Sequence, residues 1–233
     1  MDELRYDVPS AERLAELARA PLPPWLRAGS ARRWPHRDLY LDTTDGTLRA
    51  RGMVCRLRLA ADRRPVLALR IDALRTDGQP ARARARRVVA GVRAADPRAA
   101  LREDTPVTRW LRALVEPERL DVCADLEVDR WVRTALADWL GRAGLELHYD
   151  RVTARHGELV RTFQHLCAHR VRCAGTELER LAELLQHELG LRPVAADRRE
   201  RAESLLKWGH AGSARSSEIA GEGRRAAASG AAA

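Results

Sequence analysis

Arg56 and Arg58 are the residues whose type and spacing most directly suggest chemistry in this chain. They lie two apart within residues 53–59, and side chains two apart on a β-strand point to the same face. Two neighbouring guanidinium groups repel each other unless an anion lies between them. Because a guanidinium group makes paired, charge-assisted hydrogen bonds with phosphate oxygens, the two arginines predict a phosphate-rich ligand.

Further arginines follow on the next two stretches with strand character. Arg70 ends the first of them. Arg82, Arg84 and Arg86 alternate with alanines on the second. If these strands close into a barrel, one face of each strand points inward and the arginines line a basic interior. The alternative is that they face solvent, and the alternation alone favours neither arrangement.

A carboxylate set also shares one strand face. Asp125, Glu127 and Asp129 are spaced two apart, so they repel each other unless cations neutralise them. A hard divalent cation such as Mg²⁺ or Mn²⁺ is one such partner. Salt bridges to the arginine strands, or an exposed acidic face, are the alternatives.

His165, Cys167 and His169 form a second in-phase set of metal-ligating types. Imidazole and thiolate are transition-metal ligands. Three such residues along one regular strand span about 13 Å, at about 3.3 Å per residue, which is too far for one ion. We therefore expect buried, hydrogen-bonded histidines at these positions.

Turn and capping residues divide the chain into the elements that must position these side chains. Ser10 and Thr105 are helix N-caps, Asp45 and Gly46 form a turn, and Gly190 ends a helix. Strands are predicted over residues 4–8, 39–43, 53–59, 66–71, 81–89, 122–136, 145–153 and 163–172. Helices are predicted over residues 11–20, 105–115, 176–189 and 197–208. Strands joined by short turns are typical of an antiparallel meander, so the pattern predicts an α+β fold.

The totals are consistent with one folded domain and a tail. The chain has 233 residues, of which 45% are hydrophobic. We expect one domain over residues 1–208 and a disordered tail rich in Ala, Gly and Ser over residues 209–233. The chain has four cysteines but no CxxC pair, no secretory signal and no apolar run of about 20 residues. These features predict a cytoplasmic protein with reduced thiols and no membrane partner.

The net charge favours an anionic partner. It is +9, with a sequence pI of about 10.5, and basic proteins attract polyanions. A biased composition is the alternative explanation, because Lys207 is the only lysine among 42 basic residues. Aromatic residues make up only 4% of the chain, so few side chains can stack on nucleic-acid bases, and a nucleic acid is not expected as a ligand.

Several of these segments, taken in order, resemble the CYTH domain. Residues 40–48 read YLDTTDGTL, residues 52–58 read GMVCRLR, residues 67–70 read LALR and residues 147–150 read LHYD. Motifs of this kind and order are found in adenylate cyclases, thiamine triphosphatases and inorganic triphosphatases with the triphosphate tunnel fold. The resemblance extends over nearly all of residues 1–208 and implies an antiparallel barrel of roughly eight strands with flanking helices.

The resemblance also implies a site. The ligand would be a triphosphate or a polyphosphate-type anion, and Mg²⁺ or Mn²⁺ would be the cofactor. The residues that would bind the anion are Arg56, Arg58, Arg70, Arg84, Arg86 and Arg130. The residues that would bind the metal are Glu3, Asp7, Glu127 and Asp150.

The chain departs from the family pattern at the glutamate positions that bind divalent metal ions in the family. The opening ExExK motif retains only Glu3, because Arg5 and Asp7 follow it. The RxExE strand has arginine at both glutamate positions, and the late ExE strand near His165 has no carboxylate. Three functions stay open: anion binding without hydrolysis and without a metal, metal-dependent triphosphate hydrolysis, and a non-catalytic structural or protein-binding role. No catalytic residue is assigned.

Overall fold

The computed structural model describes residues 3–71, 86–136, 144–171 and 175–206, with the side chains of Arg86 and Gly175 not described. Arg82, Arg84 and the side chain of Arg86 therefore lie outside the described part, as does the predicted tail over residues 209–233.

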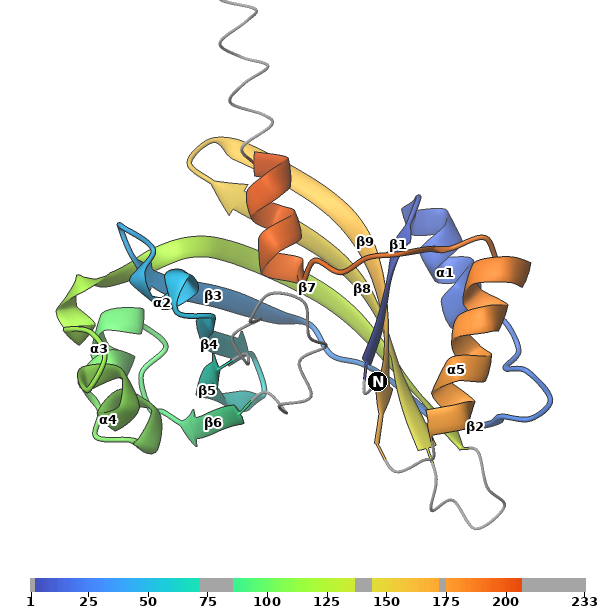
Figure 1. Cartoon of the computed structure of the whole chain (residues 1–233), viewed down its shortest axis with the longest axis horizontal. Helices are drawn as coiled ribbons and strands as arrows, with labels where there is room; N and C mark the ends of the chain where they lie inside the picture. Colours follow the sequence, from blue (N-terminus) through green and yellow to red (C-terminus); the bar gives the residue numbers. More distant parts are fainter. Residues whose placement is uncertain (1–2, 72–85, 137–143, 172–174, 207–233) are drawn as a thin grey trace, which may run out of the picture.

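A strongly curved antiparallel sheet forms the centre of the molecule (Figure 1). Its ten strands are β1 (Glu3–Val8), β2 (Arg27–Arg33), β3 (His36–Thr43), β4 (Met53–Ala60), β5 (Arg63–Ile71), β6 (Arg86–Gly91), β7 (Leu120–Leu136), β8 (Gly144–His156), β9 (Leu159–Arg170) and β10 (Arg192–Pro193). The strand order is β10-β1-β9-β8-β7-β3-β4-β5-β6, and β2 pairs with β7 beside β3. The predicted α+β class with a large antiparallel sheet is therefore confirmed.

Closure of the sheet into a barrel is not seen. Among the described residues, the two edge strands β6 and β10 do not pair with each other. Strand β10 has only two residues, and Pro193 has no N–H to donate, so pairing cannot continue along it. The part of the chain that the structure describes thus forms one curved sheet of ten strands where a barrel of about eight was predicted, and it does not show the closure of that sheet.

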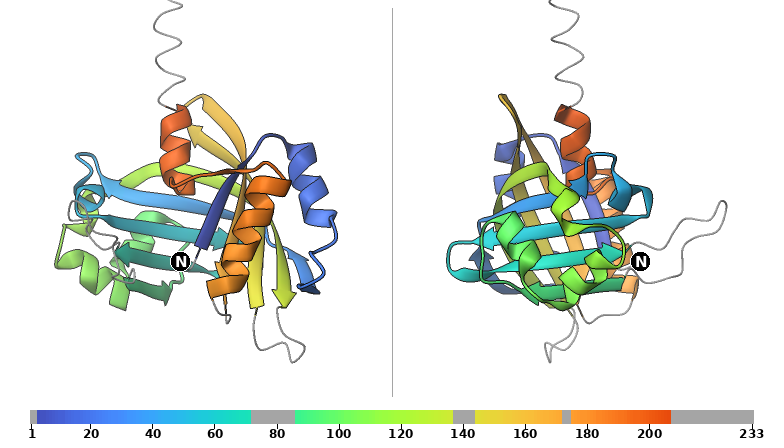
Figure 2. Two further views of the ribbon diagram at one scale, coloured as in Figure 1. Left: turned by 45° about the vertical axis from the view of Figure 1, so that its right-hand side comes forward. Right: turned by 90° about the vertical axis from the view of Figure 1, so that its left-hand side faces the viewer.

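Helices cover both ends of the outer face of this sheet (Figure 2). They are α1 (Ala11–Arg19), α2 (Thr47–Ala50), α3 (Pro97–Arg102), α4 (Pro106–Arg112), α5 (Gly175–Glu183), the 3-10 turn η1 (Pro117–Arg119) and the π turn η2 (Leu184–Glu188). A last helix covers residues 198–206. Of the described helices, none has both the length and the apolar character required to cross a membrane.

Three apolar clusters hold these layers together. Leu14 on α1 and Leu178 on α5 pack against β1, β8 and β9, and Leu111 on α4 packs against β3, β4 and β5. Ala202 and Leu206 on the last helix pack against the opposite, inner face of the sheet. At both ends of the sheet, apolar side chains of the strands are buried under the helices on the outer face. Because side chains alternate along a strand, the neighbouring residues of the same strands point to the inner face.

The sequence motif over residues 40–48 forms the end of β3 and the turn into α2. Asp42 is 3% exposed, and its carboxylate accepts hydrogen bonds from the backbone N–H groups of Thr43, Leu48 and Arg49. Its Oδ2 also accepts a hydrogen bond from Arg199 at 3.2 Å. One buried carboxylate therefore holds both the turn and the last helix in place.

Candidate functional site

A cavity of about 600 Å³ lies against the inner face of the sheet, and we call it the central cavity. Its basic lining consists of Arg5, Arg56, Arg58, Arg70, Arg87, Arg130, Arg170 and Arg198. Its other polar lining includes Glu3, Glu146, Asp197, His148, His165, His169, Cys167, Tyr40 and Trp34. The volume lies within the range of about 300–1,000 Å³ that is typical of ligand sites.

The alternation of β4 explains why its arginines face the cavity. Cys55 and Leu57 are fully buried in the apolar cluster under α3 and α4. Arg56 and Arg58 must therefore point to the opposite face, which lines the central cavity. Arg56 lies across from Tyr40 on one side and Ala68 on the other. The alternative that these arginines face open solvent does not hold.

Asp38 is the counter-ion of the β4 arginines. It is fully buried, and Arg58 donates to its two carboxylate oxygens at 2.7 and 2.8 Å. Arg56 lies 3.4 Å from the same carboxylate. Burial alone would raise the pKa of Asp38, but Arg56 and Arg58 outweigh it and hold that pKa well below its usual range. Burial lowers the pKa of Arg58 to about 10, with Arg56 contributing in the same direction.

Asp150 is the counter-ion of two further arginines. It is fully buried and accepts hydrogen bonds from Arg130 at 2.7 and 2.8 Å, and from Arg198 at 3.1 Å. Burial opposes the charged form, but Arg198 and Arg130 lower the pKa of Asp150 below its ordinary value. Both arginines occupy the carboxylate oxygens that the predicted metal ligand would need.

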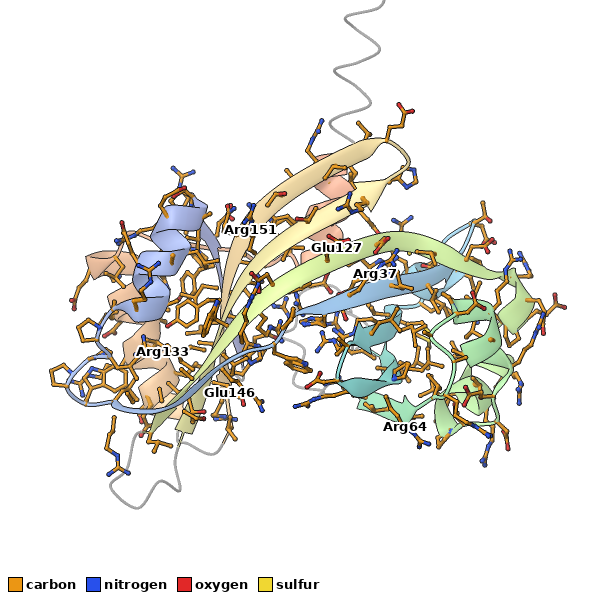
Figure 3. All side chains as sticks on the ribbon, turned by 180° about the vertical axis from the view of Figure 1, so that it is seen from behind. Arg37, Arg64, Glu127, Arg133, Glu146 and Arg151 are labelled. Atoms are coloured by element: carbon orange, nitrogen blue, oxygen red, sulfur yellow. The ribbon has the colours of Figure 1, made fainter. Side chains whose placement is uncertain are left out.

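The other predicted metal ligands lie in three separate places. Glu3 lines the cavity and accepts two hydrogen bonds from Arg5, both at 2.9 Å. Asp7 forms an ion pair with Arg201. Glu127 is exposed on the outer face of β7 and lies 3.2 Å from Arg155 (Figure 3).

Strand alternation explains the position of Glu127. Its neighbours Leu126 and Val128 are buried on the inner face, so Glu127 must point outward. Asp125 and Asp129 share this outer face and pair with Arg37 at 2.6 Å and Arg33 at 2.7 Å. The acidic set on β7 thus forms surface salt bridges rather than a metal site.

The metal implied by the CYTH resemblance therefore does not fit the residues present. Mg²⁺ and Mn²⁺ prefer a set of oxygen ligands, whereas the four predicted carboxylates do not meet. Within the described ranges, the close group of three metal-ligating side chains is Glu3, Cys167 and His169, which offers one carboxylate only.

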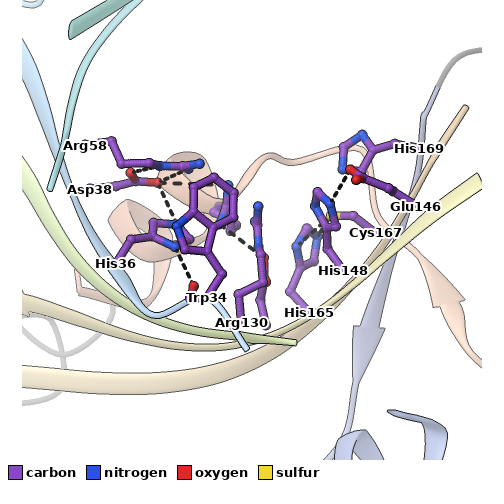
Figure 4. Close-up of polar contacts among 12 residues, drawn as sticks. Trp34, His36, Asp38, Arg58, Arg130, Glu146, His148, His165, Cys167 and His169 are labelled. Atoms are coloured by element: carbon purple, nitrogen blue, oxygen red, sulfur yellow. Dashed lines mark hydrogen bonds and ion pairs between the residues drawn. The ribbon is translucent and has the colours of Figure 1, made fainter. Parts of the chain in front are cut away.

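Strands β1, β9 and β8 arrange the remaining polar side chains in three cross-strand rows. The strand register places Glu3 beside His169 and Glu146, Arg5 beside Cys167 and His148, and Asp7 beside His165 and Asp150. Figure 4 shows His148, His165, His169 and Cys167 on one side of the site, with Arg58, Asp38 and His36 on the other.

Trp34 lies between these two sides. Its ring centroid is 5.1 Å from the Arg58 guanidinium and 5.9 Å from that of Arg130, within the range of cation–π attraction. Its backbone N–H donates to the carbonyl of Arg130 at 2.7 Å, where β2 gives way to β3. The aromatic ring thus lies within cation–π distance of arginines from two different strands.

Sequence reasoning did not single out Asp38, Trp34, Arg87 and Arg198. Of the arginines that it did name as anion ligands, Arg56, Arg58, Arg70 and Arg130 line the cavity. Asp38 could have been predicted from the sequence, because Asp38, Tyr40 and Asp42 occupy alternate positions along one strand and therefore share a face. Arg198 could not have been predicted, because no local sequence pattern shows that the last helix packs against the sheet.

Two buried histidines make the stability of the fold sensitive to acid. Burial, followed by Arg130, lowers the pKa of His148 to about 2, and burial lowers that of His165 to about 4. Asp150 opposes these shifts, and Arg198 reinforces them. Both imidazoles are therefore neutral in the folded protein at neutral pH.

We expect the free energy of unfolding to decrease as the pH falls below about 6.5, the ordinary pKa of histidine. The unfolded chain binds protons that the folded chain excludes, so acid favours unfolding by up to about 1.4 kcal/mol per pH unit for each histidine. Urea unfolding at pH 7, 6 and 5 measures this slope. His148→Asn should make the slope shallower and leave the contribution of His165. A slope near zero in the unmodified protein would contradict the expectation.

Comparisons with known proteins support the fold. No protein-family model and no curated protein sequence matches this chain. The structure is similar to that of HpAC1 from Hippeastrum, described as a candidate adenylyl cyclase with a dominant triphosphatase activity. The TM-score is 0.52 at 18% identity, over 87% of this chain and 94% of that chain. It is also similar to a candidate adenylate cyclase from Bacillus halodurans, with a TM-score of 0.53 at 15% identity, over 84% of this chain and 92% of that chain.

The fold expected from the sequence motifs, that of CYTH-type proteins, is therefore confirmed. The two matches cover nearly the whole length of both proteins, so the likeness extends to the complete fold rather than to a shared fragment. At identities of 18% and 15%, these matches show a shared fold and do not show a shared activity. The activity depends on the side chains of the central cavity.

Proposed function

We propose that this protein binds a triphosphate- or polyphosphate-type anion in the central cavity without metal-dependent hydrolysis. The observation that carries the proposal is the convergence of guanidinium groups from six strands and the last helix on one cavity of about 600 Å³. Guanidinium groups bind phosphate oxygens through charge-assisted hydrogen bonds. In this proposal the curved sheet is the wall of a phosphate-binding tunnel.

The charges of the cavity support an anionic ligand. Eight arginines line it, against three lining carboxylates and the buried Asp38 and Asp150. Arg87 lines the cavity near Arg56 and Arg70, and these like charges, together with burial as the largest cause, lower its pKa. Such an excess of positive charge is unfavourable unless an anion enters.

The same charges argue against metal-dependent hydrolysis. A divalent ion assists phosphoryl transfer when protein carboxylates hold it beside the phosphate. Here Asp38 and Asp150 are already neutralised by arginines, and Glu127 lies outside the cavity. The triphosphatase activity described for the Hippeastrum protein nevertheless makes phosphate release a necessary measurement.

Calorimetric titration of the full chain with tripolyphosphate tests the proposal. We expect binding that is equal in EDTA and in Mn²⁺, that weakens as NaCl rises, and that releases no orthophosphate. Release of orthophosphate with Mn²⁺ would instead establish a hydrolase. Absence of binding under both conditions would overturn the proposal and favour a structural or protein-binding role.

A further inference from the structure

Glu3, Cys167 and His169 bring three different metal-ligating groups together at the end of the cavity formed by β1 and β9. One carboxylate oxygen, the thiol sulfur and one imidazole nitrogen all lie within 4.8 Å of one another. Glu3 is directly opposite His169 in the strand register, and Cys167 is two residues away on the same face. The group forms across two strands, so the length limit that applies along a single strand does not apply to it.

A neighbouring imidazole lacks a partner. His148 is 8% exposed, and its ring centroid lies 4.5 Å from that of His169. Its Nε2 lies 3.2 Å from Glu146, whereas its buried Nδ1 has no hydrogen-bond partner among the described residues. Donation from Nε2 to Glu146 leaves a lone pair on Nδ1, so this nitrogen is available to a molecule bound beside His169.

We propose that Glu3, Cys167 and His169 bind a single Zn²⁺-class transition-metal ion, with the fourth position open to the central cavity. A thiolate, an imidazole and one carboxylate suit a borderline-soft ion, whereas Mg²⁺ and Mn²⁺ require more oxygen ligands. Three protein ligands with one open position are typical of zinc sites that also bind water or substrate. The site shares the central cavity with the proposed phosphate anion, but its assignment rests on the three ligand groups and not on phosphate binding.

The geometry requires only a small contraction. In tetrahedral zinc sites the ligand atoms lie about 2.0–2.3 Å from the ion, and so about 3.5 Å from one another. The side chains of Glu3 and His169 are 31% and 33% exposed, which leaves them room to rotate by the remaining distance of about 1 Å. Arg5 uses one lone pair on each oxygen of Glu3, and a carboxylate has further lone pairs for a metal.

The charge of such a site is also acceptable beside the arginines. One thiolate and one carboxylate together neutralise a divalent ion, so the loaded site is neutral; because the thiol releases its proton on binding, loading adds one positive charge to the cavity rather than two. A Mg²⁺ ion held by Glu3 alone would leave a positive charge next to Arg5, which like-charge repulsion disfavours.

Cobalt substitution tests this site directly. Tag-free full-length protein is stripped with EDTA and titrated with Co²⁺, without any phosphate ligand. We expect a thiolate-to-cobalt charge-transfer band in the near ultraviolet and the visible bands of a four-coordinate ion. Zn²⁺ should remove both, and a large excess of Mg²⁺ should remove neither. Absence of the charge-transfer band, or its loss on adding Mg²⁺, would overturn the proposal.

Single substitutions identify the ligands. Cys167→Ser should abolish the charge-transfer band, and Glu3→Gln or His169→Asn should weaken Co²⁺ binding by more than about 100-fold, since loss of an outer-shell partner costs about 10–100-fold. Cys123→Ser is the matched control, because this thiol lies by the carbonyl of Tyr40 and outside the cluster.

Circular dichroism establishes that each variant folds. If Cys167→Ser does not fold, Glu3→Gln and His169→Asn decide the outcome, because both side chains are partly exposed and we expect their replacement to leave the fold intact. A band that survives in folded Cys167→Ser, or that disappears in Cys123→Ser, would overturn the assignment. So would undiminished Co²⁺ affinity in both Glu3→Gln and His169→Asn.

Discussion

Replacing Asp150 by asparagine is expected to lower the free energy of unfolding by about 3–5 kcal/mol, the usual cost of removing one partner from a buried ion pair. The substitution keeps the shape of the side chain and creates no cavity. It leaves the guanidinium groups of Arg130 and Arg198, whose side chains are 4% and 13% exposed, without their shared carboxylate. Urea unfolding monitored by circular dichroism measures the loss.

Asp125→Asn is the matched control for this prediction. Asp125 also pairs with an arginine across two strands, but Arg37 is 50% exposed, and surface ion pairs contribute about 0–1 kcal/mol. A loss below about 1 kcal/mol for Asp150→Asn, or equal losses for the two variants, would mean that solvent reaches the buried pair.

Replacing Arg56 by alanine is expected to weaken tripolyphosphate binding by about 10–100-fold. A hydrogen bond to a charged group contributes about 1.5–3 kcal/mol, and Arg56 lines the central cavity with its side chain 17% exposed. Asp38 keeps its two short hydrogen bonds from Arg58 when Arg56 is removed. The loss should therefore appear in affinity rather than in stability, and calorimetric titration measures it.

Arg37→Ala provides the control for charge alone. It removes the same charge from the outer face of the sheet, where Arg37 pairs with Asp125, and should change the affinity less than about threefold, since exposed charges are screened by salt. Equal weakening by the two substitutions would show that the affinity for tripolyphosphate depends on the net charge of the protein and not on the arginines that line the cavity.

Local sequence patterns predicted most of the strands, and also the helices α1, α4 and α5 and the helix over residues 198–206. The alternation in β4 and β7, the turn at Asp45 and Gly46, and the cap at Thr105 all correspond to observed elements. Strand β2 was not predicted, because its residues are exposed throughout and follow Pro23 and Pro24, so no apolar period marks it. Helix α3 is too short, at six residues, for its period to be read.

The site was predicted only in part, for a physical reason. Alternation shows which side chains share a face of one strand, and it correctly grouped Arg56 with Arg58. Alternation does not show which face of a strand is covered by helices. That covering determines that Glu127 points outward and that Arg130 points inward. The pairing of Glu3 with His169 depends on the register of β1 against β9, which only the folded sheet defines.

The position of Arg198 has a consequence for how the protein is made. This residue begins the last helix of the described chain, yet it neutralises Asp150 on β8 and lies 4.0 Å from Asp38 on β3. A nascent polypeptide that has not yet emerged to residue 198 lacks the group that joins these two acidic centres. Long-range contacts of this kind form late because chain closure is entropically costly. Newly synthesised chains should therefore acquire their charge-balanced interior only after residue 198 has left the ribosome.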